Sequence, residues 1–166
     1  MTAEDWIGLL ELRPHPEGGH FREVYRSTEQ IAAACLPERF GGPRCFSTAI
    51  YYLLRSGEFS AFHTVQQDEV WHHYDGSSLT IHIVLPTGDY RRQRIGKSND
   101  PDVSPLAVVP GGLLFAASVD DPAGFTLAGC TVAPGFDFAD FHMPARAELV
   151  ARHPHHARLI EQYTRR

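Results

Sequence analysis

The sequence contains few cysteines, and their spacing forms no pair. Cys35, Cys45 and Cys130 make no Cys-x-x-Cys motif, and any single disulfide would leave one thiol over. This pattern argues against a disulfide-rich secreted scaffold and against a zinc knuckle. It predicts buried, reduced thiols in a cytoplasmic protein.

Long apolar runs and an excess of positive charge are also absent. No run approaches the ~18 residues that a membrane-spanning helix needs, and the first residues lack the basic and apolar regions of a secretory signal. The net charge is −5 at pH 7 with histidines neutral, which argues against nucleic acid as the main partner. No phosphate-binding glycine loop, EF-hand loop or Ser/His/Asp order occurs. We therefore expect neither a membrane nor a nucleic-acid partner.

What the sequence does contain is a series of short apolar or alternating segments separated by glycine and proline turns. Regular short strands of this kind predict an all-β sandwich or barrel. The expected strands cover residues 20–26, 46–54, 59–65, 70–75, 79–85, 89–95, 106–109, 113–117 and 125–132, and an alternating segment over 136–141 completes the series. Residues 28–44 are expected to be mostly loop, with a helical turn near 30–35.

Helices are expected only near the two ends of the chain. Thr2 can cap a short helix that runs to about Leu10. A tail helix covers residues 145–152, and a second one follows Pro154. No break in composition is long enough to be a linker, so we expect a single domain over residues 1–166.

The segment from Gly57 to Gly76 places a histidine and a carboxylate on neighbouring short strands. His63 follows Gly57, Glu69 follows six positions after His63, and Gly76 closes the segment. A histidine and a glutamate placed in this way are the usual material of a metal site or an acid/base pair.

This spacing resembles the first conserved motif of the cupin superfamily, in which a second histidine stands where this sequence has Val65. The second cupin motif is matched at the turn Pro110-Gly111-Gly112, while Phe115 occupies its histidine position. Residues 14–27 and 129–141 resemble one branch of the superfamily, the small cupins long labelled a domain of unknown function. The resemblance covers most of residues 9–164. It implies a double-stranded β-helix, the RmlC-like jelly-roll barrel, usually paired as a homodimer, and it implies no agreed reaction.

A metal-dependent cupin enzyme, an oxygenase or an isomerase, is one alternative. Of the four ligands that the resemblance implies, this sequence keeps His63 and Glu69, whereas catalytic metal sites normally offer three protein donors. His73 shares a strand face with Glu69, and His82 lies on the next strand, so either could supply another donor. We therefore assign no cofactor and keep a divalent metal at His63 and Glu69 as the alternative.

Metal-free acid/base chemistry is the leading hypothesis, with His63 as the acid/base catalyst and Glu69 as its partner. Residues 17–23 also resemble the opening of the nucleotide-sugar epimerases, which are metal-free cupins with a histidine base. Gly18, however, stands where those enzymes place a substrate-binding arginine. The predicted function is therefore the binding of a small molecule by an isomerase-like or epimerase-like enzyme, and a non-catalytic metabolite-binding module is a further alternative.

The ligand-binding residues expected around this pair are the aromatic and polar side chains of the barrel: His73, Tyr51, Trp71, Arg22 and His82. A small anion would contact Arg22 or Arg26. Two structural interpretations compete with these roles. Glu69 could pair with Arg22 or Arg55 across the sheet, and the phenylalanines of 136–141 could belong to the core or to a dimer interface.

Overall fold

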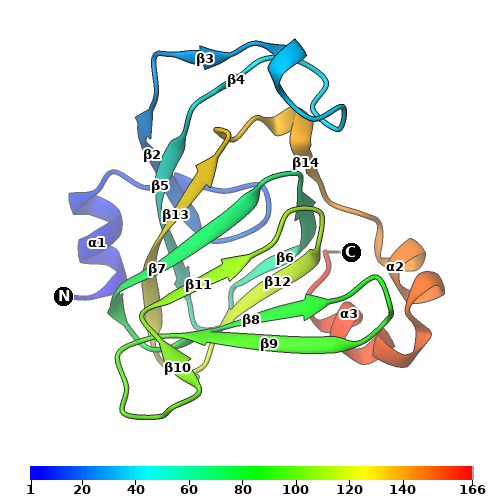
Figure 1. The fold of residues 1–166 in the computed structure, drawn as a ribbon. Coiled ribbons are helices and arrows are strands. Elements are labelled where there is room, and N and C mark those ends of the chain that lie inside the picture. Colours follow the sequence, from blue (N-terminus) through cyan, green and yellow to red (C-terminus); the bar gives the residue numbers. More distant parts are fainter. Residues whose placement is uncertain (166) are drawn as a thin grey trace.

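Two six-stranded sheets contain most of the strands in this computed structural model (Figure 1). The structure describes residues 1–165, and residue 166, the last position of the predicted domain, lies outside the described residues. The first sheet has the order β1-β2-β5-β13-β7-β11, and its neighbouring strands are antiparallel. Its strands are β1 (Arg13–Pro14), β2 (His20–Arg26), β5 (Thr48–Arg55), β13 (Phe125–Ala133), β7 (Asp68–Gly76) and β11 (Leu106–Val109).

The second sheet has the order β10-β9-β8-β12-β6-β14. Its strands are β10 (Val103–Ser104), β9 (Tyr90–Ile95), β8 (Leu79–Val84), β12 (Leu114–Val119), β6 (Phe59–Val65) and β14 (Phe141–His142). A separate two-stranded ribbon, β3 (Gln30–Ile31) and β4 (Arg44–Cys45), extends beyond the sheets at the top of Figure 1.

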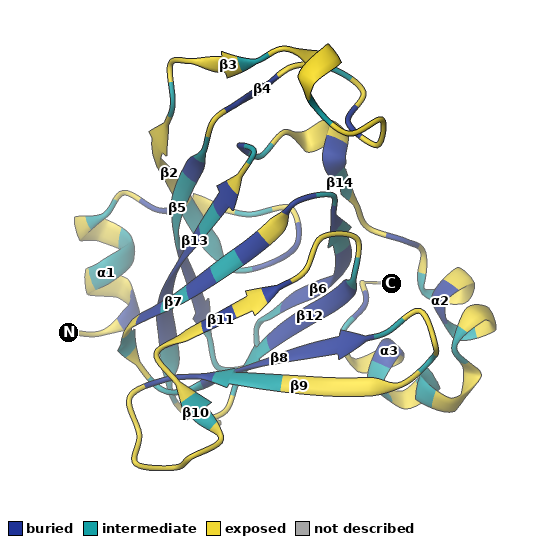
Figure 2. Cartoon of the chain, viewed as in Figure 1, coloured by how far each residue is buried: buried dark blue, intermediate teal, exposed yellow. Residues whose placement is uncertain are grey.

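The main hydrophobic core lies between the two sheets and follows from the alternation of side chains along each strand. Tyr52 and Trp71 of the first sheet pack there with Ile81 and Phe115 of the second. All six residues of β8 are buried (Figure 2). Both faces of β8 are therefore covered, one by this core and the other by the C-terminal helices.

Short helices cover the outer faces of the sheets. Helix α1 (Ala3–Leu9) begins at Thr2, whose side chain accepts a hydrogen bond from the Asp5 backbone, and it covers Leu53 and Leu127 of the first sheet. Helices α2 (Arg146–Arg152) and α3 (Ala157–Gln162), joined by the turn η3 (Pro154–His156), cover the second sheet. Fully burying a side chain such as Leu149 or Ile160 contributes about 1.5–3 kcal/mol.

The prediction of an all-β body with helices at both ends is confirmed, and the nine expected strands other than 136–141 are each present to within a few residues. Two local expectations were wrong. Residues 136–141 form the turn η2 (Phe138–Asp140) and the start of β14 in place of an alternating strand. Cys35 is exposed, although Cys45 and Cys130 are buried. The helical turn expected near 30–35 is present as the shorter η1 (Ala33–Cys35).

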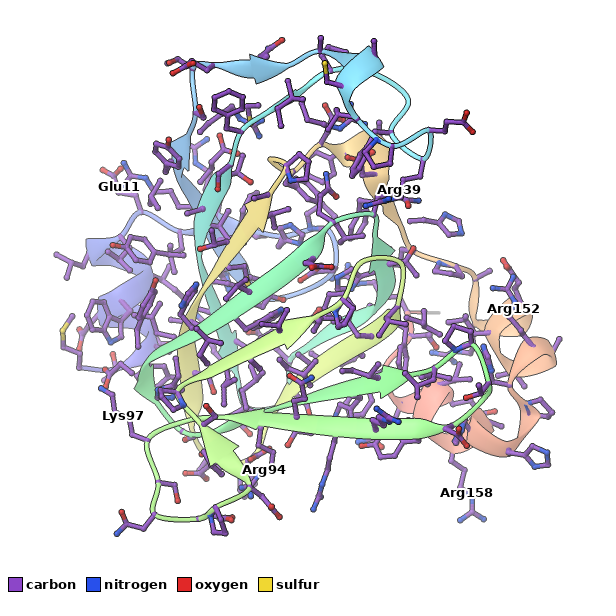
Figure 3. All side chains as sticks on the ribbon, viewed as in Figure 1. Glu11, Arg39, Arg94, Lys97, Arg152 and Arg158 are labelled. Carbon is purple, nitrogen blue, oxygen red and sulfur yellow. The ribbon has the colours of Figure 1, made fainter. Side chains whose placement is uncertain are left out.

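The basic side chains that Figure 3 labels lie at the periphery of the molecule. Arg94 pairs with Asp100 and Asp120, and Arg152 pairs with Glu148. These arginines are thus neutralised at the surface and form no anion site with the barrel interior. Among residues 1–165, no helix has the length and apolar character needed to cross a bilayer.

Candidate functional site

A cavity of about 310 Å³ lies at one end of the space between the sheets. Its lining comes from the turn before β2, from four strands of the first sheet, from β6 and from the 136–141 segment. The lining residues are His15, Glu17, Phe21, Glu23, Arg26, Thr48, Ile50, His63, Val65, Glu69, Cys130, Val132, Phe136, Asp137, Phe138 and Phe141. The cavity therefore combines aromatic rings with several ionisable groups in a largely buried space.

His63 points into this cavity from the middle of β6, and only 1% of it is exposed. Its Nδ1 lies 2.7 Å from the Ala61 carbonyl oxygen, which can only accept a hydrogen bond, so Nδ1 carries a proton. Its Nε2 lies 3.3 Å from Oε2 of Glu17. The backbone of β6 thus fixes the tautomer of His63 and directs the second ring nitrogen towards a carboxylate.

Glu17 is the buried carboxylate that the sequence interpretation missed as a site residue. Its Oε1 accepts a hydrogen bond from Ser60 at 3.0 Å, and its backbone carbonyl accepts one from Ala61 at 2.9 Å. The two glycines that follow it have positive φ, 124° at Gly18 and 67° at Gly19, a conformation that glycine adopts without steric cost. A Cβ on Gly18 would collide with the Phe59 carbonyl.

His15 completes the turn on the other side of Glu17. Its Nδ1 accepts a hydrogen bond from the Glu17 backbone at 3.2 Å and lies 3.7 Å from Oε2 of the same residue. Its ring packs edge-on against Phe21, with the centroids 4.4 Å apart. Burial lowers the pKa of His15 below its ordinary value, with the Glu17 charge opposing the shift. A carboxylate immediately before two glycines was the available sequence signal for this turn.

Glu69 lines the same cavity from β7 and is 8% exposed. Burial, assisted by the negative charge of Glu17 and opposed by His63, raises its pKa to about 7. Burial and the neighbouring Glu69 raise the pKa of the Cys130 thiol well above its usual range. Glu69 can therefore gain or lose a proton near neutral pH, while Cys130 remains a thiol.

Replacing Glu69 with glutamine should remove a pH dependence of stability. Because the folded-state pKa of about 7 lies above the ordinary value of 4.5, the folded protein binds the extra proton, and this contribution to stability is lost as the pH rises from 4.5 to 7. The wild type should lose about 3 kcal/mol relative to Glu69→Gln over this window. Urea unfolding of both proteins at several pH values measures the difference. An exposed Glu148→Gln variant is the control, and parallel curves for wild type and Glu69→Gln would contradict the burial argument.

The expected pair, His63 and Glu69, is brought to one cavity, whereas the other two candidates on β7 lie further along the strand. A strand rises about 3.3 Å per residue, so Trp71 and His73 are carried away from Glu69. Trp71 is 1% exposed and packs in the core against Tyr52, with centroids 5.6 Å apart. Nε2 of His73 lies 3.1 Å from the Ser77 carbonyl. Neither lines the cavity, so the expectation that His73 adds a donor beside Glu69 was wrong.

Tyr51, Arg22 and His82 also lie away from the cavity, because each occupies the outward phase of its strand. Tyr51 packs with the cluster under α1, and the inward residue is its neighbour Tyr52. Arg22 pairs with Glu11 at 3.0 Å. The expected contact of these side chains with a ligand in this cavity is not supported by their positions.

His82 occupies a polar cluster of its own beneath α3. Its Nδ1 lies 2.8 Å from the Tyr90 hydroxyl, its Nε2 lies 3.0 Å from Ser118 Oγ, and its ring stacks on Tyr163. Burial lowers the pKa of His82 to about 4. It is a neutral, structurally bonded histidine that cannot reach His63 through the sheet.

The alternative that Glu69 pairs with an arginine across the sheet was wrong. Arg22 pairs with Glu11, and Arg55 pairs with Glu4 at 3.2 Å and with Glu58 at 3.9 Å. Glu69 faces the cavity from the opposite side of the sheet, which leaves it close to Glu17 and His63.

The 136–141 phenylalanines were expected in the core or at a dimer interface, and the structure places three of them on the cavity: Phe136, Phe138 and Phe141. A buried ion pair holds this segment in position. Arg44 of β4 donates two hydrogen bonds to Asp140 at 2.7 and 2.5 Å, and Gln67 donates a third at 2.6 Å. This clamp ties the segment to β4 and to the β6–β7 turn (Figure 1).

The donor set does not fit the metal that many cupins hold. Val65 and Phe115 occupy two family ligand positions, and the Phe115 ring lies 4.2 Å from the His63 ring. Within residues 1–165, no group of three or more His, Cys, Asp or Glu side chains is arranged to hold an ion. Nδ1 of His63 is already bonded to a carbonyl. We therefore derive no chemistry through a metal.

Residues 4–144 match the family model described as "Cupin superfamily (DUF985)". The chain belongs to this family. The family prediction is thus confirmed, and with it the jelly-roll fold class. No curated protein matches the sequence.

Solved structures extend this family likeness. A protein from Shewanella oneidensis is 36% identical, with a TM-score of 0.88 over 99% of this chain and 98% of that one. A hypothetical protein from Leishmania major is 35% identical, with a TM-score of 0.90 over the full length of both chains (100% of each). Oxalate decarboxylase from Bacillus subtilis is 16% identical, with a TM-score of 0.55 over 92% of this chain and 37% of that one. This last likeness shows the fold alone.

Proposed function

We propose that this cupin binds a small molecule in its cavity and moves protons to and from it without a metal, as an isomerase or epimerase does. The observation that carries the proposal is the meeting of His63, Glu17 and Glu69 on one buried cavity, with His63 Nε2 3.3 Å from Glu17. The cavity volume of about 310 Å³ falls at the lower end of the range for small-molecule sites.

His63 and Glu17 act as one proton-holding unit in this proposal. Nδ1 of His63 already donates to Ala61, so an unprotonated Nε2 would bring a second acceptor close to an oxygen of the carboxylate. Two acceptors facing each other at 3.3 Å in a buried site repel. The arrangement therefore favours one proton shared by His63 and Glu17, available to an atom of a bound ligand.

Glu69 supplies the complementary group. A carboxyl with a pKa of about 7 is ionised in a substantial fraction of molecules near neutral pH, and it is then a much stronger base than an exposed carboxylate. Two titratable groups with different environments on one cavity are typical of an acid/base pair.

The proposed reaction conserves protons overall. Glu69 removes a proton from a carbon next to an electron-withdrawing group of the ligand, and the His63–Glu17 pair delivers a proton to another atom of the same ligand. The bonding electrons of the broken C–H bond shift within the ligand, so no oxidant or reductant is needed. Return of both groups to their starting states through exchange with water completes an isomerisation.

Deuterium incorporation from D₂O tests this proposal. The protein is incubated with a panel of small carbonyl compounds, amines and hydroxy acids, and NMR or mass spectrometry detects exchange of carbon-bound hydrogen. We expect at least one compound class to exchange faster with wild-type protein than in buffer. Binding without exchange across the panel would favour a non-catalytic metabolite-binding module and contradict the catalytic part.

A homodimer and a cytoplasmic setting belong to the same proposal. Val24 and Tyr25 of β2 and the nearby Phe46 are exposed at 47%, 54% and 46%, and exposed apolar strand surfaces need cover. The free cysteines favour a reducing compartment, which supports the cytoplasmic setting.

The homodimer can be tested directly. Light scattering should give twice the chain mass, and Tyr25→Glu should shift the protein towards monomer. A monomeric wild type at micromolar concentration would contradict the dimer.

A further inference from the structure

Three phenylalanine rings form a box at the mouth of the cavity. The ring centroids of Phe136 and Phe138 are 5.1 Å apart with planes at 81°, and those of Phe138 and Phe141 are 6.1 Å apart at 81°. The third pair, Phe136 and Phe141, is separated by 6.3 Å at 66°. The three rings therefore meet at steep angles within edge-to-face distance of one another, and all three line the cavity. The ring of His15 stacks on Phe138 at 6.5 Å.

The charges around this box are mainly negative. Four carboxyl groups line the cavity, and the arginine that lines it is Arg26. That arginine is occupied. Its Nε and Nη2 donate to the two oxygens of Glu23 at 2.9 and 2.7 Å, and Nη1 and Nη2 both donate to the Phe136 carbonyl. Arg26 thus holds the box together and is not free to bind an anionic ligand.

Asp137 stands between Phe136 and Phe138 in the sequence, lines the cavity and is exposed. Its Oδ1 accepts a hydrogen bond from the Ala139 backbone at 2.8 Å, which orients the carboxylate without neutralising its charge. Aromatic faces attract cations through the ring quadrupole, and aromatic cages recognise alkylated ammonium groups. A nearby carboxylate adds direct Coulomb attraction, which is stronger in a partly buried site than in water.

We propose that the box of Phe136, Phe138 and Phe141, with Asp137 beside it, binds the ammonium group of a small organic cation. This inference names the ligand class for the proposed proton-transfer site and rests on that proposal. The ammonium group occupies the mouth, and the rest of the ligand extends inward towards His63 and Glu69. A carboxylate or phosphate ligand would instead meet Glu17, Asp137 and an arginine that is already paired, which argues against the expected anion at Arg26.

Matched ligands separate the charge of the ligand from its shape. The probes are choline, its uncharged carbon isostere dimethylbutanol, and the anion dimethylbutanoate, titrated by NMR at constant ionic strength. We expect choline to bind at least roughly tenfold more tightly than dimethylbutanol, and the anion to bind more weakly than either. Equal affinity for choline and its isostere, tighter binding of the anion, or no binding by any probe would overturn the inference.

Variants locate the binding to the box. Phe138 is 56% exposed, so the Phe138→Leu variant should fold normally. It should weaken the binding of choline by roughly three- to tenfold and the binding of dimethylbutanol by less than about twofold. Asp137→Asn should weaken choline selectively. The control is Tyr74→Leu, at a 43%-exposed aromatic residue that is not among the cavity-lining residues, which should leave both affinities unchanged. Choline affinity that is insensitive to both box variants would overturn the assignment.

The two proposals fail in different ways. If choline binds as expected but no ammonium compound exchanges hydrogen in D₂O, the catalytic proposal fails and the box stands. If exchange occurs only with anionic or neutral compounds, the proton-transfer site stands and the ammonium inference fails.

Discussion

Replacing His63 or Glu17 with glutamine should lower the rate of deuterium incorporation by about 10²–10⁴-fold, the usual contribution of a positioned acid or base. Glutamine keeps most of the hydrogen-bonding volume of either side chain but cannot hold the shared proton. Because His63 Nε2 and Glu17 Oε2 are 3.3 Å apart, the two changes remove one unit. The double variant should therefore be little slower than either single variant.

A matched control for these changes is His72→Gln, which makes the same replacement on the outer face of β7, where His72 stacks on Tyr74. Its exchange rate should stay within about twofold of the wild type. Losses that multiply in the double variant would show that His63 and Glu17 act independently, and an unchanged rate in Glu17→Gln would remove Glu17 from the mechanism.

Replacing Asp140 with alanine should destabilise the protein by about 3–5 kcal/mol, because it leaves a buried arginine without its partner. Asp140 is 5% and Arg44 6% exposed, and they join by two hydrogen bonds. Gln67 would lose its 2.6 Å bond to the same carboxylate. Urea unfolding followed by fluorescence measures the loss, with the exposed Asp102→Ala as the control.

The double variant Arg44→Met with Asp140→Leu tests the cause of that loss. Replacing both charges by apolar side chains of similar volume removes the unpaired buried charge and should recover most of the stability. It should also preserve the position of the 136–141 segment, and hence choline binding. A loss below about 1 kcal/mol in Asp140→Ala would show that the clamp contributes little.

The alternation of side chains along each strand predicted that His63 and Glu69 face the interior, and it could also have predicted that His82 faces outward. His63 and Glu69 were expected in the interior, and both line the cavity. His82 was offered as a candidate although Ile81 and Ile83 on either side of it face the core. The same period-2 rule therefore places His82 outside, and its assignment as a ligand neglected that rule.

Other features depended on contacts between residues far apart in the sequence. Glu17 enters the cavity because the two glycines after it turn the chain and because Ala61 binds its carbonyl. The 136–141 segment covers the cavity because Asp140 pairs with an arginine 96 residues away. A local pattern of alternating phenylalanines resembles a strand, and the turn that forms depends on the Asp137 cap together with this long-range ion pair.

The most direct test of metal-independent proton transfer compares exchange before and after metal removal. The metal content of the untagged protein is measured as purified. Its deuterium incorporation with the best compound of the panel is then followed before and after treatment with a strong chelator. We predict less than about one-tenth of an equivalent of bound metal and an unchanged rate, because catalytic sites normally use three protein donors and no three donor side chains within residues 1–165 are arranged to hold an ion. A rate that is lost on chelation and restored by one equivalent of a divalent metal would contradict the account.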